Sequence, residues 1–495
     1  MLPLLAAALL AADPWTATPL PFTLVTGETA RKPLPATMPG GVAVFDFDND
    51  GRLDLFFPNG GALPNGPKAP DKLLRNLGGL KFEDVTARAG VAGADYHFAA
   101  AAADFDRDGR VDLLVCGLRS VTLYRNLGDG RFADVTRDSG IDNQGRWSTG
   151  AAWFDYDADG DLDLFVVNYV AWNPATEREC VVAGKPDFCH PRFYEPQPNA
   201  LFRNEGKGKF TDVSAASGIA AHKGKGMAAA VADFDADGRP DIFVTNDRVF
   251  SFLFRNKGNG TFAEAAFDFG VAAPLDGKPA SAMGADAQDF DNDGRPDLTY
   301  TALADETFPL YRNHDGRDLA DATAPTGVAV LTRAMAGWGV AFADLDNDGW
   351  KDLAYARGGV LSRQPQPLSW LRNEKGQRFA NAGVLDAMSR MHRGLVAADL
   401  DDDGCLDLVV TVLEAPARVV RNPCRATGHW LEVQASPATR VRVNRQWREA
   451  WTTSVGYASS YVGPLHFGVG AETEVELEIA GQPPRRVKAD QVVKP

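Results

Sequence analysis

One pattern recurs seven times in this 495-residue chain and limits what the chain can fold into. Each copy has Asp at positions 1, 3, 5 and 9 and Gly at position 6, as in "DFDNDGRLD" from Asp46 to Asp54. The aspartates of the seven copies are Asp46, Asp48, Asp50 and Asp54; Asp104, Asp106, Asp108 and Asp112; Asp155, Asp157, Asp159 and Asp163; Asp233, Asp235, Asp237 and Asp241; Asp289, Asp291, Asp293 and Asp297; Asp344, Asp346, Asp348 and Asp352; and Asp399, Asp401, Asp403 and Asp407. Four carboxylates this close repel one another unless a cation neutralises them.

The chemistry of the pattern predicts calcium. Hard oxygen ligands at alternate positions, with Gly for a sharp turn, are typical of calcium loops. Positions 1, 3, 5 and 9 would give side-chain oxygens and position 7 a backbone carbonyl, so the side chain at position 7 can vary, as Arg52, Trp350 and Cys405 do. An EF-hand would need Glu at position 12 between two helices, whereas here that position is apolar or neutral, as at Phe57, and the flanks alternate like strands. We therefore predict up to seven Ca²⁺ sites in β-hairpins; the alternative is an Asp-rich surface turn without metal.

The charge balance agrees with this interpretation. The formal net charge is −15, which argues against nucleic acid or an anionic membrane as a partner. The seven loops hold 28 of the 66 acidic residues, and seven Ca²⁺ would add +14 to the net charge. Most of the acidity is thus predicted to belong to metal sites.

The chain begins with an apolar run, "MLPLLAAALLAADPW". Residues 1–12 are predicted to be a secretory signal peptide, although no Lys or Arg precedes the run, and the alternative is a disordered apolar start. The run is too short to span a bilayer, and no other apolar stretch reaches that length. We expect a secreted, periplasmic or extracellular protein that does not span the membrane.

Five cysteines suit an oxidising compartment. Cys180 and Cys189 share one long, Pro-rich, irregular segment and are predicted to form a disulfide. Cys405 and Cys424 flank the turn "LEAPA" and could face each other across a hairpin. Cys116 lies in the apolar strand "VDLLVCG" and is expected to be a core thiol.

Each repeat has four strand-like parts around its Asp loop. A small-residue strand precedes the loop, an apolar strand follows it, a third strand ends in Arg-Asn, and a fourth follows a tight Gly turn, as in "GDGRFADVT". Seven such units predict an all-β fold, a seven-bladed β-propeller over residues 13–427. The seventh unit lacks its fourth strand, so residues 21–26, "PFTLVT", are predicted to complete the last blade. Residues 428–495 lack both motifs and are predicted to form a small C-terminal β domain.

The Arg-Asn pairs recur as regularly as the Asp loops, from "LLRN" in the first unit to "VVRN" in the seventh. They could form a ring that binds a ligand. The favoured interpretation is a structural tie at each blade, with a neighbouring loop carboxylate as its partner, because function rarely needs sevenfold identity.

The repeats resemble the FG-GAP/VCBS calcium-loop repeats of integrin α-chain heads and many secreted bacterial proteins. The ending "SVGYASSYVGPLHFGVG" resembles the ASPIC/UnbV domain, and the two together resemble the cartilage acidic protein/UnbV family over nearly the whole chain. The segment from Cys180 to Cys189 is similar to that family's two-cysteine insertion, which supports the predicted disulfide. One departure is "EIAGQPP" at residues 478–484, where the family has a Trp-Pro-x-Gly turn. The resemblance implies calcium binding and an extracellular setting.

The topology predicts which face carries a ligand. In a four-stranded blade, the connections that hold the Asp loops lie on one face, and the long connections lie on the opposite face, where binding usually occurs. The long connections are residues 58–72, 168–199, 265–283 and 357–369. The candidate ligand residues near the channel mouth of that face are His97, Trp147, Lys225, Met283, Trp338 and Arg393. The alternative for each is packing between blades.

The sequence contains no His-Glu-x-x-His, Gly-x-Ser-x-Gly or P-loop motif, so we identify no catalytic residues and do not expect an enzyme. The favoured function is a monomeric, non-catalytic binding or adhesion module with structural calcium, whose ligand binds opposite the calcium loops. Its partner would be an extracellular or envelope protein or a glycan. The alternatives are a lectin-like carbohydrate-binding propeller and a polysaccharide-active enzyme that uses the channel.

Overall fold

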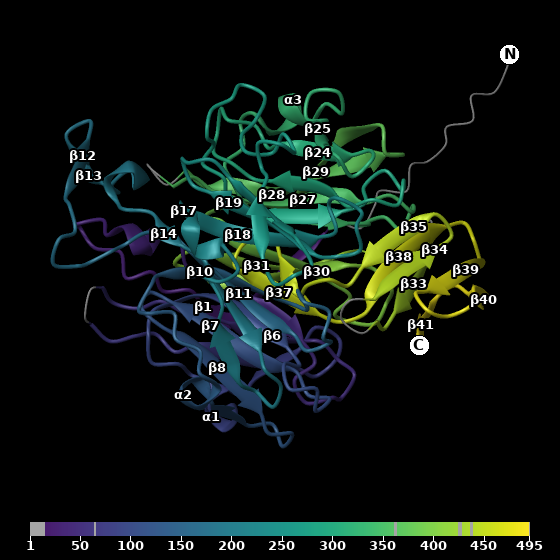
Figure 1. Ribbon diagram of the computed structural model, residues 1–495, viewed down its shortest axis with the longest axis horizontal. Helices are drawn as coiled ribbons and strands as arrows, with labels where there is room; N and C mark the ends of the chain where they lie inside the picture. The colour runs from purple at the N-terminus through teal and green to yellow at the C-terminus, as the bar shows by residue number, and fades with distance from the viewer. Residues whose placement is uncertain (1–14, 64–65, 361–363, 424–427, 436–438, 495) are drawn as a thin grey trace, which may run out of the picture.

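The computed structural model describes residues 15–494 apart from 64–65, 361–363, 424–427 and 436–438. The predicted signal peptide, residues 1–12, lies outside the described residues. The fold is all-β, as predicted, and its main body is a ring of four-stranded antiparallel sheets (Figure 1).

Seven sheets in the described part of the chain share one strand order, from the axis of the ring outward. The innermost strands are β2 (Ala43–Phe45), β6 (His97–Ala103), β10 (Ser148–Phe154), β18 (Gly226–Ala232), β22 (Ala285–Gln288), β26 (Gly337–Ala343) and β30 (His392–Ala398). The second strands are β3 (Asp54–Phe57), β7 (Asp112–Gly117), β11 (Asp163–Asn168), β19 (Asp241–Asn246), β23 (Asp297–Tyr300), β27 (Asp352–Arg357) and β31 (Asp407–Val412). The third strands are β4 (Lys72–Asn76), β8 (Val121–Asn126), β15 (Ala200–Asn204), β20 (Phe252–Asn256), β24 (Leu310–Asn313), β28 (Gln366–Glu374) and β32 (Pro416–Arg421). The outer strands are β5 (Phe82–Asp84), β9 (Phe132–Asp134), β16 (Phe210–Asp212), β21 (Phe262–Glu264), β25 (Leu319–Asp321), β29 (Arg378–Arg390) and β1 (Thr16–Thr23).

The innermost strands contact one another in cyclic order, and β30 returns to β2, so the sheets form a closed ring. Small side chains make this possible, because strands that converge on an axis leave little space between them. The run from Ala99 to Ala103 in β6 is fully buried, as is the Ala-rich β18. The apolar core lies between neighbouring blades. This arrangement is that of a β-propeller.

The seventh sheet is completed by the N-terminus, because β1 pairs antiparallel with β32 and is the outermost strand. The strand spans Thr16–Thr23, so the predicted range of 21–26 was shifted toward the C-terminus. Phe22 from β1 stacks on Phe57 of the first blade, with ring centroids 4.6 Å apart. The first and last blades are thus joined by a strand that precedes both in the sequence.

The remaining short elements lie in the connections. They are α1 (Thr86–Ala89), α2 (Thr136–Ser139), α3 (Val328–Thr332), the 3-10 turns Leu34–Thr37, Pro191–Phe193 and Ile219–Ala221, and strands β12 (Cys180–Val182), β13 (Lys185–Asp187), β14 (Gln197–Pro198) and β17 (Lys223–Gly224). The β12–β13 hairpin projects from the ring at the left of Figure 1.

Beyond residue 428 the chain forms two further sheets that pack against the ring (yellow in Figure 1). Their strands are β33 (His429–Val433), β34 (Arg440–Val443), β35 (Gln446–Glu449), β38 (Leu465–Gly470), β39 (Glu474–Ile479), β40 (Arg485–Lys488) and β41 (Gln491–Val493). One sheet has the order β38-β33-β41 and the other β35-β34-β39-β40, with a shared core that includes Leu431, Val443, Phe467 and Leu477.

Two strands of this C-terminal region leave it and enter the ring. β36 (Ser454–Val455) and β37 (Ser459–Val462) form a hairpin, and β37 pairs parallel with β2, so the first blade becomes a six-stranded sheet. Backbone hydrogen bonds join this segment to the inner strands of other blades, from Ala100 to Ala458 and from Ala285 to Gly456. The segment therefore occupies the central channel, which the sequence interpretation had treated as open.

Candidate metal centres

Each Asp loop joins an innermost strand to the second strand of the same blade, as predicted. In the first loop, the oxygens of Asp46 accept hydrogen bonds from the backbone N–H groups of Asp50 and Gly51 at 3.1 and 2.8 Å. Asp54 accepts from the N–H groups of Phe47 and Asn76 at 3.1 and 2.7 Å. In each of the other six loops, the N–H of the position-6 Gly likewise donates to the carboxylate of the position-1 Asp. Gly at position 6 has a positive φ throughout, 89° at Gly51, which explains why no other residue occurs there.

The carboxylates of a loop converge. In five triads, such as Asp46, Asp48 and Asp50, or Asp155, Asp157 and Asp163, one oxygen from every residue lies within 4.8 Å of the others, and the described residues contain two more groups of this kind. Because all the candidate ligands are oxygens and most are carboxylates, the set suits a hard divalent cation such as Ca²⁺.

The hydrogen bonding of the loop oxygens tests whether these residues fit a cation. Buried polar atoms in proteins almost always have a hydrogen-bond partner. Among the described residues, buried loop oxygens without a partner occur in every loop, and they include Oδ1 of Asp48, Asp106, Asp155, Asp235, Asp291, Asp346 and Asp401. These Asp residues are at position 3 of their loops, except in the third loop, where the residue is Asp155 at position 1. A cation among the carboxylates would satisfy them, so the residues fit the metal that the pattern predicts.

The electrostatics of the loops point the same way. Burial raises the pKa of Asp54 to about 8; neighbouring carboxylates add to the effect and backbone hydrogen bonds oppose it. The position-9 residues Asp112, Asp163, Asp241 and Asp407 also have a pKa raised to about 8 by burial. For Asp297 and Asp352 burial likewise raises the pKa well above its ordinary value. The protein alone therefore disfavours the ionised form of the residue that begins each second strand.

The Arg-Asn pairs are structural ties, as the favoured interpretation held. In six blades the Arg forms an ion pair with the position-3 Asp of its own loop, for example Arg75 with Asp48 at 2.6 Å and Arg372 with Asp346 at 2.7 Å. In the third blade Arg203 instead pairs with Glu205. In the six blades with an Arg–Asp pair, the Arg uses one oxygen of the position-3 carboxylate, and the second oxygen can face the other carboxylates of the loop.

The Asn of each pair joins neighbouring blades. Its side-chain amide donates to the backbone carbonyl at position 2 of the preceding blade's Asp loop at 2.8–2.9 Å, and the pairs are Asn76–Leu400, Asn126–Phe47, Asn204–Phe105, Asn256–Tyr156, Asn313–Phe234, Asn373–Phe290 and Asn422–Leu345. The Asn76–Leu400 bond closes the circle between the first and seventh blades. Each Asp loop is thus tied to the next blade by Asn, and six of the seven are also tied to their own blade by Arg.

The predicted ligand residues at the channel mouth are not exposed. The residues concerned, His97, Trp147, Lys225, Met283, Trp338 and Arg393, are all buried, with at most 5% of their surface accessible. They pack between structural elements, which was the alternative interpretation, so these six side chains do not form an exposed ring.

Three of their contacts show why. His97 lies 2.7 Å from Asp71, Trp147 packs edge-on against Tyr169, and the Arg393 guanidinium stacks over Trp338 at 3.8 Å. Trp338 in turn packs against Tyr457 of the segment in the channel. The sequence offered no signal that the channel would be filled.

A small cavity remains at this mouth. It is lined by Met283 and Trp338, by the buried Tyr169–Asp247 hydrogen bond, and by Phe188 from the two-cysteine insertion. Its volume is about 40 Å³, whereas small-molecule sites typically measure about 300–1,000 Å³. The cavity is therefore too small for a sugar ring.

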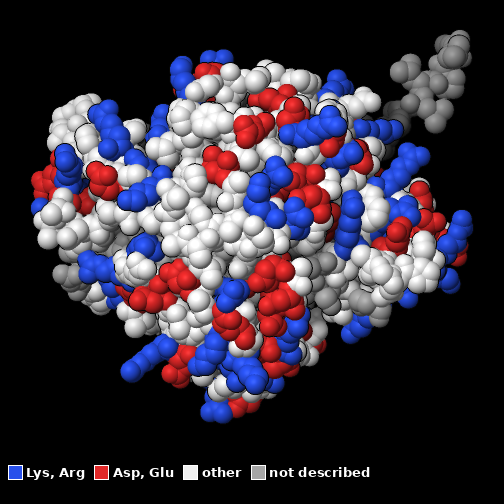
Figure 2. Space-filling view, viewed as in Figure 1, with Lys and Arg blue, Asp and Glu red and all other residues white. Residues whose placement is uncertain are grey.

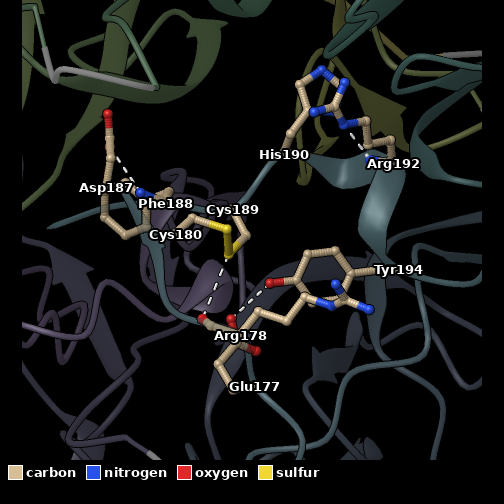
Figure 3. Close-up of a disulfide and its surroundings, with 9 residues drawn as sticks. All are labelled: Glu177, Arg178, Cys180, Asp187, Phe188, Cys189, His190, Arg192 and Tyr194. Atoms are coloured by element: carbon tan, nitrogen blue, oxygen red, sulfur yellow. Dashed lines mark hydrogen bonds between the residues drawn. A yellow bond between two sulfur atoms is a disulfide. The ribbon is translucent and has the colours of Figure 1, made fainter. Parts of the chain in front are cut away.

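The predicted disulfide between Cys180 and Cys189 is present, with a Cα–Cα distance of 5.2 Å (Figure 3). It closes the β12–β13 hairpin, whose Val181 and Val182 side chains are exposed. Cys116 is a buried free thiol, as expected. Cys424 lies outside the described residues, so the pairing of Cys405 with Cys424 stays a prediction.

The ring, the Asp loops and their spacing define the class of this protein. A family model for FG-GAP-like repeats matches residues 46–115, 104–166, 184–244, 233–300 and 289–355, and the chain belongs to the FG-GAP-like repeat family. It is also homologous to cartilage acidic protein 1, which confirms the predicted cartilage acidic protein/UnbV resemblance.

The human cartilage acidic protein 1 is 26% identical over 494 residues, covering 90% of this chain and 69% of the human protein. The mouse protein is 26% identical over 357 residues, which cover 69% of this chain and about half, 51%, of the mouse protein.

Among solved structures, two are similar to this chain at low identity. An Agrocybe aegerita lectin that recognises non-reducing terminal N-acetylglucosamine has a TM-score of 0.45 and 16% identity, covering 74% of this chain and 84% of the lectin. BBS1N in complex with ARL6DN has a TM-score of 0.47 and 11% identity, covering 83% of this chain and 98% of that chain. No helix within the described residues has the length and apolar character needed to cross a membrane.

Proposed function

We propose that this protein is a secreted, calcium-stabilised binding module in which each Asp loop holds one Ca²⁺. The observation that carries the metal assignment is the buried, unpartnered carboxylate oxygen in every loop. Positions 1, 3, 5 and 9 would supply the ligands, and the ion would neutralise carboxylates that otherwise repel one another across the hairpin. The Cys180–Cys189 disulfide and the homology to cartilage acidic protein 1 support a setting outside the cytoplasm.

Thermal melting tests the metal assignment. Because binding to the folded state stabilises it, the melting temperature should fall in excess EGTA and recover when Ca²⁺ is restored. A melt that is the same in EGTA and in Ca²⁺ would contradict the assignment.

We place the ligand site on the face opposite the Asp loops, in a groove between the fourth, fifth and sixth blades. The groove has a volume of about 630 Å³, and its walls come from residues 274–280, 305–309 and 321–333, all of which connect strands on that face. Leu275 and Val330 line it and are 79% and 85% exposed. Exposed apolar side chains within a polar rim are typical of interaction sites.

The groove suits a protein partner better than a glycan. Its rim mixes acidic and basic groups, among them Asp305, Arg333 and the ion pair of Arg248 with Glu306 at 3.0 Å. Mixed charge also covers the face shown in Figure 2, where Lys and Arg side chains interleave with Asp and Glu. Such a surface can match the alternating charges of a polypeptide, and aliphatic rather than aromatic side chains form its apolar part.

A pull-down with matched variants tests this site. The protein would be immobilised in Ca²⁺ and exposed to envelope and extracellular extract, and the bound material would be analysed for protein and for sugar. We expect a protein that is captured by the parent and lost with Leu275→Asp and Val330→Asp, and retained with Val384→Asp, a half-exposed position on β29 outside the groove. Capture that survives the groove variants would contradict this site, and a glycan in its place would favour the lectin-like alternative.

A further inference from the structure

The C-terminal domain sits directly on three of the seven Asp loops, those of the fifth, sixth and seventh blades. Arg440 donates from Nη2 to the carbonyl of Gly294 in the fifth loop at 2.6 Å. The N–H of Gly470 donates to the carbonyl of Asn347 in the sixth loop at 2.9 Å. These carbonyls belong to the turn of the loop, next to the metal-ligand positions.

The same contact continues on the seventh loop. His466 lies with Nε2 3.1 Å from the carbonyl of Gly404, and Trp430 packs so closely on Gly404 that a Cβ atom there would collide with the indole. In the sixth loop, a Cβ atom at Gly468 would collide with the carboxylate of Asp344. Most of these residues come from "LHFGVG", the motif that carries the domain's family resemblance. Its His and both its Gly residues thus contact Asp loops.

Burial separates these three loops from the other four. The position-1 carboxylates Asp289, Asp344 and Asp399 are 4%, 0% and 6% exposed. Their counterparts in the first four loops, Asp46, Asp104, Asp155 and Asp233, are only half-buried. The domain therefore covers one set of candidate metal loops and leaves the other set partly exposed.

We propose that the C-terminal domain docks on the calcium-loaded form of the fifth, sixth and seventh loops, so that calcium binding there and docking of the domain are one coupled equilibrium. This inference rests on the proposed function of the loops as calcium sites. Position-1 carboxylates hold the turn by accepting its N–H groups, for example Asp344 from Gly349 at 2.8 Å. A loop whose carboxylates repel one another would no longer hold the carbonyls of Gly294, Asn347 and Gly404 where the domain needs them.

Hydrogen exchange of the full-length protein tests the coupling with two matched variants. Asp346→Asn removes a position-3 carboxylate from the sixth loop, and Asp106→Asn removes its equivalent from the second loop; each is ion-paired to the Arg of its blade, at 2.7 and 2.6 Å. In Ca²⁺ we expect Asp346→Asn to raise the rate of amide exchange in β33 and β38 about ten-fold, because the domain would open locally as one structural unit. Asp106→Asn should leave that rate unchanged. Equal effects of the two variants on β33 and β38, or no effect of either, would overturn the proposal.

A second variant tests the coupling from the domain side, without touching a metal ligand. Because coupling between two binding events is reciprocal, Arg440→Gln should weaken calcium binding at a subset of sites about five-fold in a calcium titration. Arg442→Gln is the control, since Arg442 lies in the same strand but pairs with Glu476 and Glu478 of its own domain. Unchanged calcium affinity in Arg440→Gln would overturn the coupling.

Measurements on the wild-type protein distinguish a failure of this inference from a failure of the proposed function. A titration that detects no calcium binding would overturn both. Calcium binding that leaves exchange in β33 and β38 the same in Ca²⁺ and in EGTA would overturn the coupling alone.

Discussion

At the scale of single residues, the Asn of each Arg-Asn pair holds neighbouring blades together. Asn204 shows the arrangement: its side-chain amide donates to the carbonyl of Phe105 in the preceding blade and to that of Leu162 in its own, at 2.9 and 3.0 Å. The N–H of Gly206 donates to its side-chain oxygen at 3.0 Å. All of its polar atoms are used, and it is buried.

Replacing Asn204 with Ala should therefore destabilise the ring. Each buried group left without a partner costs about 1–3 kcal/mol, so the free energy of unfolding should fall by at least that amount. Its neighbour Arg203 pairs only with Glu205 at the surface, and Arg203→Ala should change stability by about 0.5 kcal/mol or less. Chemical denaturation of both variants in Ca²⁺ measures the difference; equal effects would contradict the role assigned to Asn.

The position-9 aspartates make the calcium-free protein sensitive to pH. Burial raises the pKa of Asp54 and of four of its counterparts, Asp112, Asp163, Asp241 and Asp407, to about 8, above the value of about 3.9 expected when unfolded. Protonation therefore favours the folded state, and the stability that it contributes is lost as pH rises through the folded pKa. In EGTA we expect the melting temperature to fall between pH 6 and pH 9.

Calcium should oppose that dependence. Because the ion requires ionised ligands, the rise in melting temperature caused by Ca²⁺ should grow over the same pH range. Melting curves in EGTA and in Ca²⁺ at each pH give both quantities. A calcium effect that shrinks as pH rises would contradict the assignment of position 9 as a ligand.

At the scale of elements, the blades could be predicted from the sequence because the pattern of each blade lies within a short segment. The Asp spacing, the Gly at position 6 and the alternating flanks lie within one hairpin, so each hairpin could be recognised alone. The predicted Cys180–Cys189 disulfide is local in the same sense. The N-terminal strand required an inference across the whole chain, and its position was displaced by several residues although its place in the last blade was anticipated.

The closing strand makes a prediction of its own. Phe22 of β1 is buried against Phe57 of the first blade, so Phe22→Ala should lower the free energy of unfolding by about 3–5 kcal/mol. Thr18 is exposed on the same strand, and Thr18→Ala should change it by about 0.5 kcal/mol or less. Denaturant titrations compare the two; a Phe22→Ala protein as stable as the control would contradict closure by β1.

The contacts of the C-terminal region could not be predicted, because they join segments distant in sequence. Small residues near Tyr457 let its backbone enter the channel, and the Ala-rich inner strands leave room for it. Neither feature shows in the sequence which segment it will contact. The same segment explains why Trp338 is buried, although its place at the channel mouth suggested a ligand. The family motif indicated that "LHFGVG" matters, and only the structure shows that it lies on Asp loops.

At the scale of the whole molecule, the two faces of the ring differ in chemistry. The Asp loops line one face, and on three of them rests the C-terminal domain. The long connections line the other, where the groove with Leu275 and Val330 lies. Calcium binding and ligand binding would then be separate tasks on opposite faces, linked by the rigidity of the blades between them.

The measurement that tests this account most directly is the number of calcium ions bound per folded chain, obtained by native mass spectrometry after exchange into trace Ca²⁺. The account predicts a series of calcium-bound masses that extends to seven ions, collapses in EGTA, and loses its highest member when one loop carries a position-3 Asp→Asn substitution such as Asp235→Asn. A folded protein with the same mass in Ca²⁺ and in EGTA would contradict it.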